Sequence, residues 1–335
     1  MSVTLLARRL LPEPVRAPLR GVMHSARAYS RARRVLARYS RHYAAVHLAY
    51  RRAHPGASGG PRAIAALGVL TIPPDAPPDA LPLPPAPPAL VERLGRDVAE
   101  RLSWTAQCRF FPPTTDAALP LPPRSDAVDA VRRGETIALQ LIDVRGLDGL
   151  EEFCAAVVPV IEERMYGAHV LVDKVYVYRS PVSRQQPQAS WVWHYDEHPR
   201  EVLKLMLYLT DVTGDTAPFM FLARGGDGRA VIGTRTPLYG QSRMSPARMA
   251  RFQASGCVAR AVTGPRGTLV LFNDNVIHRA TLATRAHRDV LVLQLRPTDR
   301  PRRPLADPRW TGSFQNLDFN RDPAVVEPQP WPGGR

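Results

Sequence analysis

The chain has 335 residues, 44% of them hydrophobic, and its 45 Lys and Arg against 30 Asp and Glu give a formal net charge of +15. This length and composition predict one sizeable core domain with extensions, and they argue against a membrane-spanning helix, because no run of 18 apolar residues occurs. Three widely spaced cysteines argue against a disulfide scaffold, and the N-terminus lacks the apolar stretch of a signal peptide, so we expect a cytoplasmic protein.

Basic charge is concentrated at the N-terminus, where residues 1–52 hold twelve arginines and a single acid, Glu13. Apolar residues at heptad spacing predict one amphipathic helix over roughly 19–52 with an arginine-rich outer face. We expect this basic arm, residues 1–58, to contact its own domain. The alternative is an acidic partner or a membrane surface, and nucleic acid is disfavoured because no recognition module accompanies the charge. The heptad positions are Val22, Tyr29, Ala32, Leu36, Tyr39, Tyr43, Val46 and Tyr50.

Proline dominates the next segment, residues 59–125, which favours an extended linker over a packed element. Only the stretch from Leu90 to Leu102 has the apolar spacing of a short helix. We therefore expect a Pro-rich linker with a short helix between the arm and the main domain.

From residue 126 onward the sequence combines one helical segment with several strand-like runs. Apolar residues at helical spacing between Leu150 and Ile161 predict a helix with one buried face. Strands joined by long polar loops predict a mainly β fold with supporting helices. We expect a double-stranded β-helix (jelly roll or cupin-like) core over 126–300 behind a basic helical N-terminal extension, and an irregular C-terminal tail over 301–335. The predicted strands are 170–179, 202–209, 268–272 and 290–295.

Two histidines and one aspartate form a candidate metal-binding set. A strand projects residues i and i+2 to the same side, so His194 and Asp196 point together while Tyr195 points away. His278 follows another strand-like run and can supply a third ligand. Two imidazoles and one carboxylate with open positions form the ligand set of non-heme Fe(II) oxygenases, although zinc uses similar donors. We expect His194, Asp196 and His278 to bind the metal and to be catalytic.

Arg288 opens the last strand-like run, ten residues after the distal histidine. Its guanidinium is suited to grip a dicarboxylic acid by a bidentate pair, and a buried charge needs such a partner. The alternative is a surface salt bridge with Asp289 or Glu201, and Arg285 is the fallback. The order His-x-Asp, distal His, Arg is the arrangement that 2-oxoglutarate chemistry needs.

Lys204 is a second cationic candidate for the same pocket. Alternation within 202–209 places the leucines toward the supporting helices and Lys204 and Tyr208 toward the barrel interior. There Lys204 can neutralise a carboxylate, whereas the alternative is a lysine that snorkels to solvent from an edge strand.

This ordered set resembles the phytanoyl-CoA dioxygenase-like family of Fe(II)/2-oxoglutarate-dependent oxygenases, over roughly residues 138–297. The resemblance is carried by His194-x-Asp196, the strand 203–208, the run 267–272, His278 and Arg288. The family often has a Gly-Pro-Phe turn, where this chain has Ala217-Pro218-Phe219. It also often has a hydroxyl two residues beyond the distal histidine, where this chain has Ala280 followed by Thr281, which makes Thr281 a candidate cosubstrate contact.

The resemblance implies Fe(II), 2-oxoglutarate as cosubstrate and O2, with hydroxylation of a C–H bond and release of succinate and CO2. The carboxylate of Asp196 favours hydroxylation over halogenation, because a small residue there would open a halide site. We expect a small-molecule or carrier-linked metabolite as substrate. The rival hypothesis is a non-catalytic jelly-roll binding protein that docks on acidic partners through its basic arm.

Overall fold

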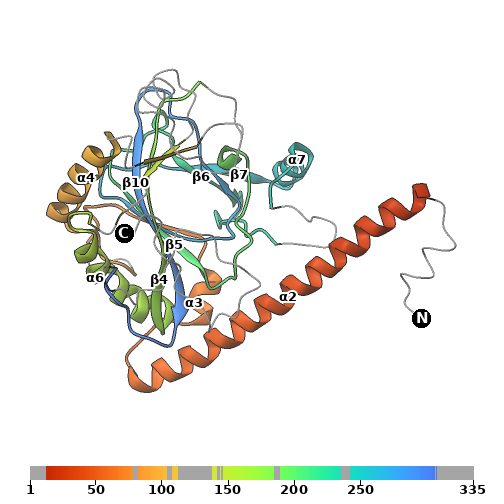
Figure 1. Ribbon diagram of the computed structural model, residues 1–335, viewed down its shortest axis with the longest axis horizontal. Coiled ribbons are helices and arrows are strands. Elements are labelled where there is room, and N and C mark those ends of the chain that lie inside the picture. Colours follow the sequence, from red (N-terminus) through yellow and green to blue (C-terminus); the bar gives the residue numbers. More distant parts are fainter. Residues whose placement is uncertain are drawn as a thin grey trace.

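The structure is a computed structural model that describes residues 13–77, 82–103, 108–111, 138–141, 144, 146–184, 189–234, 242–305 and 307. For residues 13–29, 31, 32, 35, 108–111 and 189 the description covers the backbone alone. Within these ranges, a seven-stranded sheet of order β1-β8-β5-β10-β4-β3-β2 accompanies a three-stranded sheet of order β7-β6-β9 (Figure 1). All strand pairs are antiparallel, as expected for a jelly roll.

We call the larger sheet the major sheet and the smaller one the minor sheet. The major sheet consists of β1 (Val69–Ile72), β2 (Cys108–Phe111), β3 (Ala138–Leu141), β4 (His169–Ser180), β5 (Leu203–Tyr208), β8 (Leu269–Asn273) and β10 (Arg288–Thr298). The minor sheet consists of β6 (Phe219–Arg224), β7 (Cys257–Val262) and β9 (His278–Arg279). The helices are α2 (Glu13–Ala53), α3 (Pro61–Ala66), α4 (Pro88–Ser103), α6 (Leu150–Ile161) and α7 (Pro246–Ala254), with a π-helical turn η2 (Glu162–Tyr166) and a 3-10 turn η3 (Ala189–Trp191).

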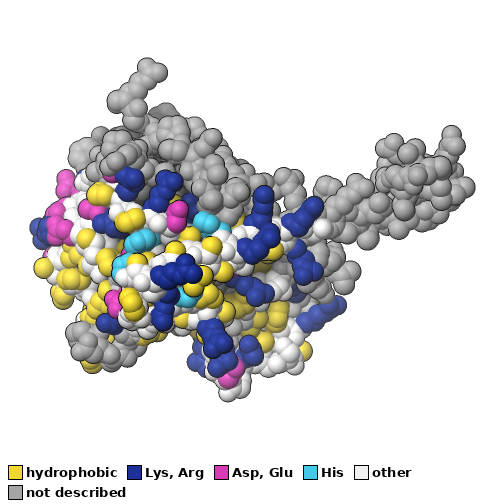
Figure 2. All heavy atoms as spheres, turned by 90° about the horizontal axis from the view of Figure 1, so that it is seen from below, with side chains coloured by type: hydrophobic (Ala, Val, Ile, Leu, Met, Phe, Trp, Pro, Cys, Tyr) yellow, Lys and Arg dark blue, Asp and Glu magenta, His cyan; other side chains and the backbone are white. Residues whose placement is uncertain are grey.

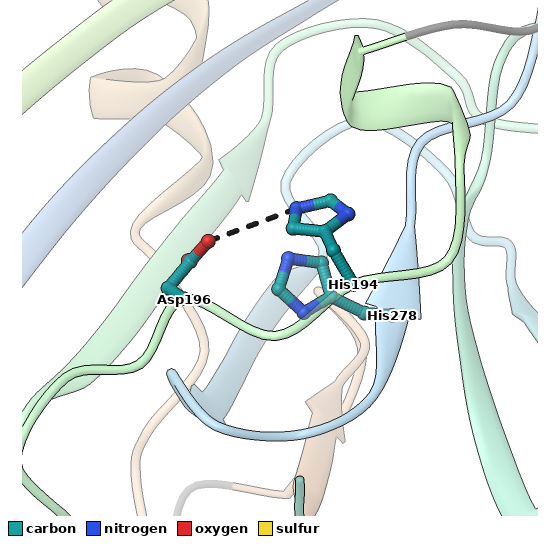
Figure 3. A group of neighbouring side chains, drawn as sticks. All are labelled: His194, Asp196 and His278. Atoms are coloured by element: carbon teal, nitrogen blue, oxygen red, sulfur yellow. Dashed lines mark ion pairs between the residues drawn. The ribbon is translucent and has the colours of Figure 1, made fainter. Parts of the chain in front are cut away.

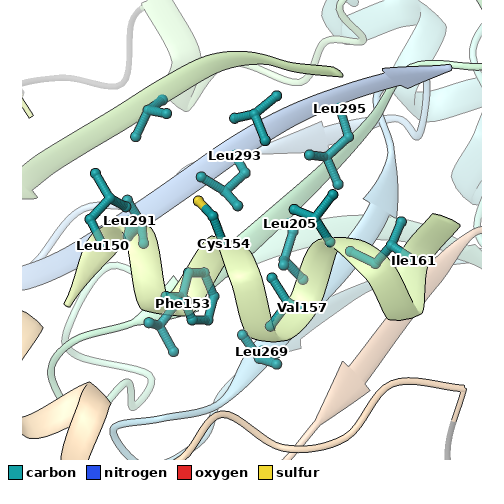
Figure 4. Close-up of a cluster of buried hydrophobic side chains, with 14 of the residues drawn as sticks. Leu150, Phe153, Cys154, Val157, Ile161, Leu205, Leu269, Leu291, Leu293 and Leu295 are labelled. Atoms are coloured by element: carbon teal, nitrogen blue, oxygen red, sulfur yellow. The ribbon is translucent and has the colours of Figure 1, made fainter. Parts of the chain in front are cut away.

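The outer face of the major sheet is covered by helices. Side chains alternate along a strand, and the outward positions of β5, β8 and the middle of β10 are leucines. Phe153 and Val157 of α6 pack on these leucines, and Figure 4 shows the helix lying across the strands. The four strands and the helix that the sequence predicted in this region are confirmed, with ends that differ by a few residues. The labelled leucines are Leu205, Leu269, Leu291, Leu293 and Leu295.

The inner face of the major sheet packs against the minor sheet through a second apolar cluster. Met206 and Tyr208 of β5 meet Phe272 of β8 and Phe219 of β6 in this cluster. The phenol of Tyr208 is fully buried and donates a hydrogen bond to the carbonyl of Val262 at 2.8 Å. The predicted orientation of β5, with leucines outward and Lys204 and Tyr208 inward, is therefore what the structure has.

The C-terminal part of α2 packs on the domain, while its N-terminal part projects beyond the sheets (Figure 1). Tyr43 is 2% exposed, and its hydroxyl donates to the carbonyl of Tyr166 at 2.6 Å. Ser40 donates to the carboxylate of Glu201 at 2.7 Å. The heptad residues from Tyr39 to Tyr50 thus face the domain, whereas Val22, Tyr29 and Ala32 lie where side chains are not described.

The outer face of α2 carries exposed arginines, as the heptad pattern predicted. Figure 2, which views the molecule from below, shows basic side chains spread over this side of the protein. The exposed arginines described on α2 are Arg33, Arg34, Arg38, Arg41, Arg51 and Arg52. No helix in the described part of the chain is long and apolar enough to cross a bilayer.

Two parts of the segment 59–125, a strand and a helix, pack with the main domain. Strand β1 pairs with β8 at the edge of the major sheet, with Val69 opposite Phe272. Helix α4, which the sequence did predict, buries Leu94 and Val98 completely. A four-residue strand beside prolines is too short to show a periodicity, which is why composition favoured a linker. Residues 112–137 and 308–335, which include most of the predicted tail, lie outside the described residues.

Replacement of Tyr43 by alanine tests whether α2 is a structural part of the domain. Tyr43→Ala removes a buried ring and leaves the Tyr166 carbonyl without its donor, so the free energy of unfolding should fall by about 3–5 kcal/mol. Leu48→Ala is the control on the same helix, because Leu48 is 53% exposed and such changes usually cost within about 0.5 kcal/mol. Urea denaturation measures both, and equal effects would mean that α2 is not anchored through Tyr43.

Candidate metal centre and cosubstrate pocket

His194 and His278 are joined through their backbones. The amide of His194 donates to the carbonyl of His278 at 2.9 Å, and the amide of His278 donates back at 2.8 Å. This isolated antiparallel bridge attaches the loop before β5 to β9 and brings the two ring centroids to 4.4 Å. Tyr195 and Ile277 then face the opposite side and pack in a separate apolar cluster. The predicted alternation at His194, Tyr195 and Asp196 is therefore present.

Each imidazole is oriented by a backbone carbonyl two residues before it. Nδ1 of His194 lies 2.8 Å from the carbonyl of Val192, and Nδ1 of His278 lies 2.7 Å from the carbonyl of Val276. A carbonyl oxygen only accepts, so Nδ1 carries a proton in both rings, and Nε2 is the nitrogen left to bind a metal. Burial, together with the nearby His194, lowers the pKa of His278 to about 3. Both features favour the neutral imidazole that binds metals.

Asp196 completes the group, with its Oδ1 at 3.7 Å from Nε2 of His194 (Figure 3). Burial alone raises the pKa of Asp196, but Lys204 and the two histidines outweigh it and hold this pKa well below its usual range. Asp196 is therefore an anion at neutral pH. One donor atom from each of the three residues lies within 4.8 Å of the others. Two imidazole nitrogens and one carboxylate oxygen are a donor set that fits a divalent first-row metal such as Fe(II).

The three donors open onto a cavity of about 300 Å³ between the two sheets. Phe219 and Phe272 flank His278, with ring centroids at 5.4 and 5.8 Å from its own, and they make this side of the cavity apolar. Trp191 of η3 also lines the cavity. The walls thus combine aromatic rings with the three donors and leave room for a ligand.

Arg288 lines the same cavity and is 1% exposed. Its Nη2 lies 3.4 Å from the hydroxyl of Ser180, and its guanidinium carbon lies 5.9 Å from the ring centroid of Tyr178. Its Nε and Nη1 have no hydrogen-bond partner among the described residues. A buried guanidinium without a carboxylate partner is costly, so this residue is prepared for an anion that enters the cavity.

Neither alternative for Arg288 fits the described residues. Asp289 forms a two-pronged pair with Arg179, with both N–O distances at 2.7 Å, and Glu201 accepts from Ser40. Both carboxylates that the sequence offered as surface partners are therefore engaged by other residues. The fallback residue Arg285 lies at the surface with its side chain 82% exposed, 3.8 Å from Asp215, and so it does not reach the cavity.

Lys204 lies at the cavity, as predicted, but its ammonium group is already engaged by protein carboxylates. It donates to Oδ2 of Asp196 and forms an ion pair with Oδ1 of Asp274 at 2.8 Å. Burial lowers the pKa of Lys204, but the two carboxylates raise it well above its usual range. The ammonium group of Lys204 thus contacts the carboxylate of Asp196 itself, and a contact with a cosubstrate carboxylate stays a prediction.

Thr281 does not line the cavity. Its hydroxyl donates to the carbonyl of Pro218 at 2.8 Å, so it tethers the segment after β9 to the turn before β6. In the family pattern the hydroxyl would be at the position of Ala280. Thr281 is one residue further along, and because side chains alternate, its hydroxyl points away from the cavity.

Asp274 is the important residue that the sequence reasoning missed. It is fully buried, its backbone carbonyl accepts from the amide of Asp196 at 3.2 Å, and its Oδ2 pairs with Nδ1 of His198. His198 itself is buried, with 6% of its surface exposed. The signal available in the sequence was the Asn-Asp-Asn run directly after the strand that precedes His278.

Comparisons with known proteins give one curated relative and several distant structures. No family model matches the chain. It is 27% identical over 193 residues to L-proline trans-4-hydroxylase of Streptomyces griseoviridis, an alignment that covers 49% of this chain and 72% of that enzyme. Among solved structures it is similar to iron-bound EctD from S. alaskensis, with a TM-score of 0.48 and 17% identity, over 81% of this chain and 87% of the other. It is also similar to HygX from Streptomyces hygroscopicus with nickel and 2-oxoglutarate bound, with a TM-score of 0.37 and 15% identity, over 79% and 94%.

Lys174 is a second lysine in the barrel interior. It lies opposite Gln294, which in turn lies opposite Lys204, so the two lysines flank one glutamine across three strands. Lys174 is fully buried, with its Nζ 5.3 Å from the ring centroid of Tyr176. Burial, assisted by repulsion from Lys204, lowers the pKa of Lys174 to about 7.

The lowered pKa of Lys174 makes stability depend on pH. Between pH 7 and pH 9 the unfolded chain keeps a proton on this amine, whose ordinary pKa is 10.5, while the folded protein loses it. Stability rises with pH wherever the unfolded state binds more protons, so the free energy of unfolding should increase over this range. Lys174→Met should flatten this increase in urea denaturation at a series of pH values. An equal slope in both proteins would assign the pH dependence to other groups.

Proposed function

We propose that this protein is an Fe(II)- and 2-oxoglutarate-dependent oxygenase that hydroxylates a C–H bond of a small molecule. In this proposal His194, Asp196 and His278 bind the iron, and Arg288 binds the distal carboxylate of 2-oxoglutarate. The observation that carries the proposal is the buried guanidinium of Arg288, which faces the same cavity as the three donors without a carboxylate partner among the described residues. The curated hydroxylase relative supports the same class of reaction.

Iron and 2-oxoglutarate, when bound, supply the oxidising chemistry, in which O2 and 2-oxoglutarate yield succinate, CO2 and a hydroxylated substrate. The chain supplies position and surroundings. The carbonyls of Val192 and Val276 fix which imidazole nitrogens face the cavity. Arg288 provides a fixed two-pronged anchor for a carboxylate, and Phe219 and Phe272 limit the access of water.

The size of the cavity limits the substrates that this reaction can use. The cavity of about 300 Å³ suits a small molecule beside the cosubstrate, and a carrier-linked metabolite remains the other form. L-proline is the first compound to test, because the curated relative hydroxylates it according to its name. The residue pattern supports membership of the phytanoyl-CoA dioxygenase-like family, and the three separated cysteines support the cytoplasm as compartment.

The rival role, a non-catalytic jelly-roll protein that docks on acidic partners, draws on the exposed arginines of α2. An active enzyme could also use those arginines to bind an anionic partner, so they do not distinguish the two roles. The two roles separate in one assay. Iron-loaded protein supplied with 2-oxoglutarate, O2 and candidate substrates releases succinate if it is an oxygenase, and it releases none under any of these conditions if it only binds.

The metal assignment predicts a single Fe(II) site that depends on both histidines. His194→Ala and His278→Ala should each abolish stoichiometric Fe(II) binding in anaerobic titrations, because two remaining donors do not hold the ion comparably. His287→Ala is the matched control, since the His287 side chain is 43% exposed and lies outside the cavity. Full-strength binding in either of the first two variants would remove these residues from the site.

The cosubstrate assignment predicts a specific defect in Arg288→Ala. This variant should keep its iron yet bind 2-oxoglutarate about 30-fold more weakly or worse, because truncating one member of a buried charge pair typically costs about 2–5 kcal/mol. Arg288→Lys should recover part of the loss, since an ammonium group cannot form the two-pronged contact. Titration of 2-oxoglutarate into anaerobic, iron-loaded protein measures both constants.

Arg285→Ala serves as the control for Arg288, because Arg285 is exposed and pairs with Asp215. It should bind 2-oxoglutarate as the unmodified protein does. An unchanged constant in Arg288→Ala would show that the cosubstrate is anchored elsewhere, and it would favour the binding-protein role.

A further inference from the structure

The chain contains 45 Lys and Arg residues, and only Lys174 and Lys204 among them are lysines. Both lie in the barrel interior, on either side of Gln294. An ammonium group is a compact point charge with three donors, whereas a guanidinium is a larger planar fork. The ammonium group of Lys204 forms ion pairs with two carboxylates, those of Asp196 and Asp274.

Lys204 stands in the middle of a row of charges that is fully buried at Asp274 and partly exposed at Asp196. His198 pairs with Oδ2 of Asp274, the other oxygen of Asp274 lies 2.8 Å from Nζ of Lys204, and Nζ donates to Oδ2 of Asp196. His198 is held in turn, because its carbonyl accepts from the amide side chain of Asn275 at 2.6 Å. The row is built from the loop before β5, from β5 itself and from the end of β8, so three separate segments fix it.

The row distinguishes the two oxygens of Asp196. Oδ1 lies on the side of His194, 3.7 Å from its Nε2, while Oδ2 is taken by Lys204. A carboxylate with two free oxygens can bind a metal through both and fill two positions. With Oδ2 engaged, Asp196 presents one oxygen only.

We propose that Lys204, held by Asp274, is a positioning residue that restricts Asp196 to a single metal-binding oxygen and so preserves the positions that the cosubstrate needs. This inference rests on the function proposed above. An ion held by these three donors would need its further positions free for the 2-oxoacid and O2. A second oxygen from Asp196 would compete with one of these ligands.

Asp274 explains how the ammonium group of Lys204 can lie next to a metal-binding site. A lone ammonium group beside a dication would repel it, since like charges at this range in a buried site interact strongly. The carboxylate of Asp274 offsets the charge of Lys204, and the negative charge of Asp196 remains for the metal. Asp274 is fully buried and lies outside the cavity, so its role is exerted through Lys204.

The test compares Lys204→Met, Asp274→Asn and the double variant with the unmodified protein, all loaded with Co(II) under nitrogen. Co(II) reports its coordination number through its visible absorption, which gives a readout independent of turnover. Lys204→Met should change the Co(II) spectrum and weaken 2-oxoglutarate binding by about 10-fold or more, the usual size of effects at groups that orient metal ligands. Asp274→Asn should act in the same direction, and the double variant should be no worse than Lys204→Met, because both act through one row.

Lys174→Met is the matched control, because it removes the other interior lysine and should leave the Co(II) spectrum unchanged. Thermal unfolding verifies that each variant is folded, and the isosteric Asp274→Asn carries the test if Lys204→Met does not fold. An unchanged spectrum and unchanged 2-oxoglutarate affinity in Lys204→Met and Asp274→Asn would overturn this inference alone. Tighter Co(II) binding with an unchanged spectrum would also overturn it, since Lys204 would then act only as a repelling charge. Failure of the unmodified protein to bind Co(II) would overturn the proposed function as well.

Discussion

Two backbone hydrogen bonds, exchanged between His194 and His278, are the constraint on which the candidate site depends. They connect the loop before β5 to the short strand β9, two segments that are far apart in the sequence. Because side chains alternate along extended backbone, this one bridge sets both imidazoles toward the cavity and Tyr195 and Ile277 away from it. The distance between the two rings is thereby set by strand pairing rather than by the conformation of flexible side chains.

The major sheet separates two different environments. Its outer face is a continuous layer of leucines under α4 and α6, and its inner face carries the polar and aromatic groups of the cavity. Along β10 the inner face runs from Arg288, through Val290 and Val292, to Gln294 beside Lys204. The cavity therefore has a guanidinium toward one end and the metal donors with their lysine toward the other. In the proposed function, this arrangement would hold a dicarboxylate at both of its ends.

Sequence reasoning identified the parts of this arrangement that depend on periodicity. The alternation of leucines in β5 was sufficient to orient Lys204, and the spacing of His194 and Asp196 was sufficient to place them on one side. It did not identify β1, whose four residues show too little alternation to separate a strand from a linker. The partnership of Lys204 with Asp274 depends on the register between β5 and β8, which no local pattern specifies. The role predicted for Thr281 rested on a family pattern across a one-residue shift, and in the structure its hydroxyl donates to the carbonyl of Pro218.

The burial of Arg288 without a carboxylate partner among the described residues has an energetic consequence for the whole fold. The folded chain bears the cost of desolvating this cation, and a bound dicarboxylate relieves it. A ligand that binds only the folded state shifts the folding equilibrium, by about 2.7 kcal/mol at a concentration 100-fold above its dissociation constant. Under the proposed function, the lifetime of the protein against proteolysis is thereby linked to the cellular supply of a central-metabolism dicarboxylate. In that proposal, the same cation that binds the cosubstrate would make the persistence of the protein depend on its concentration.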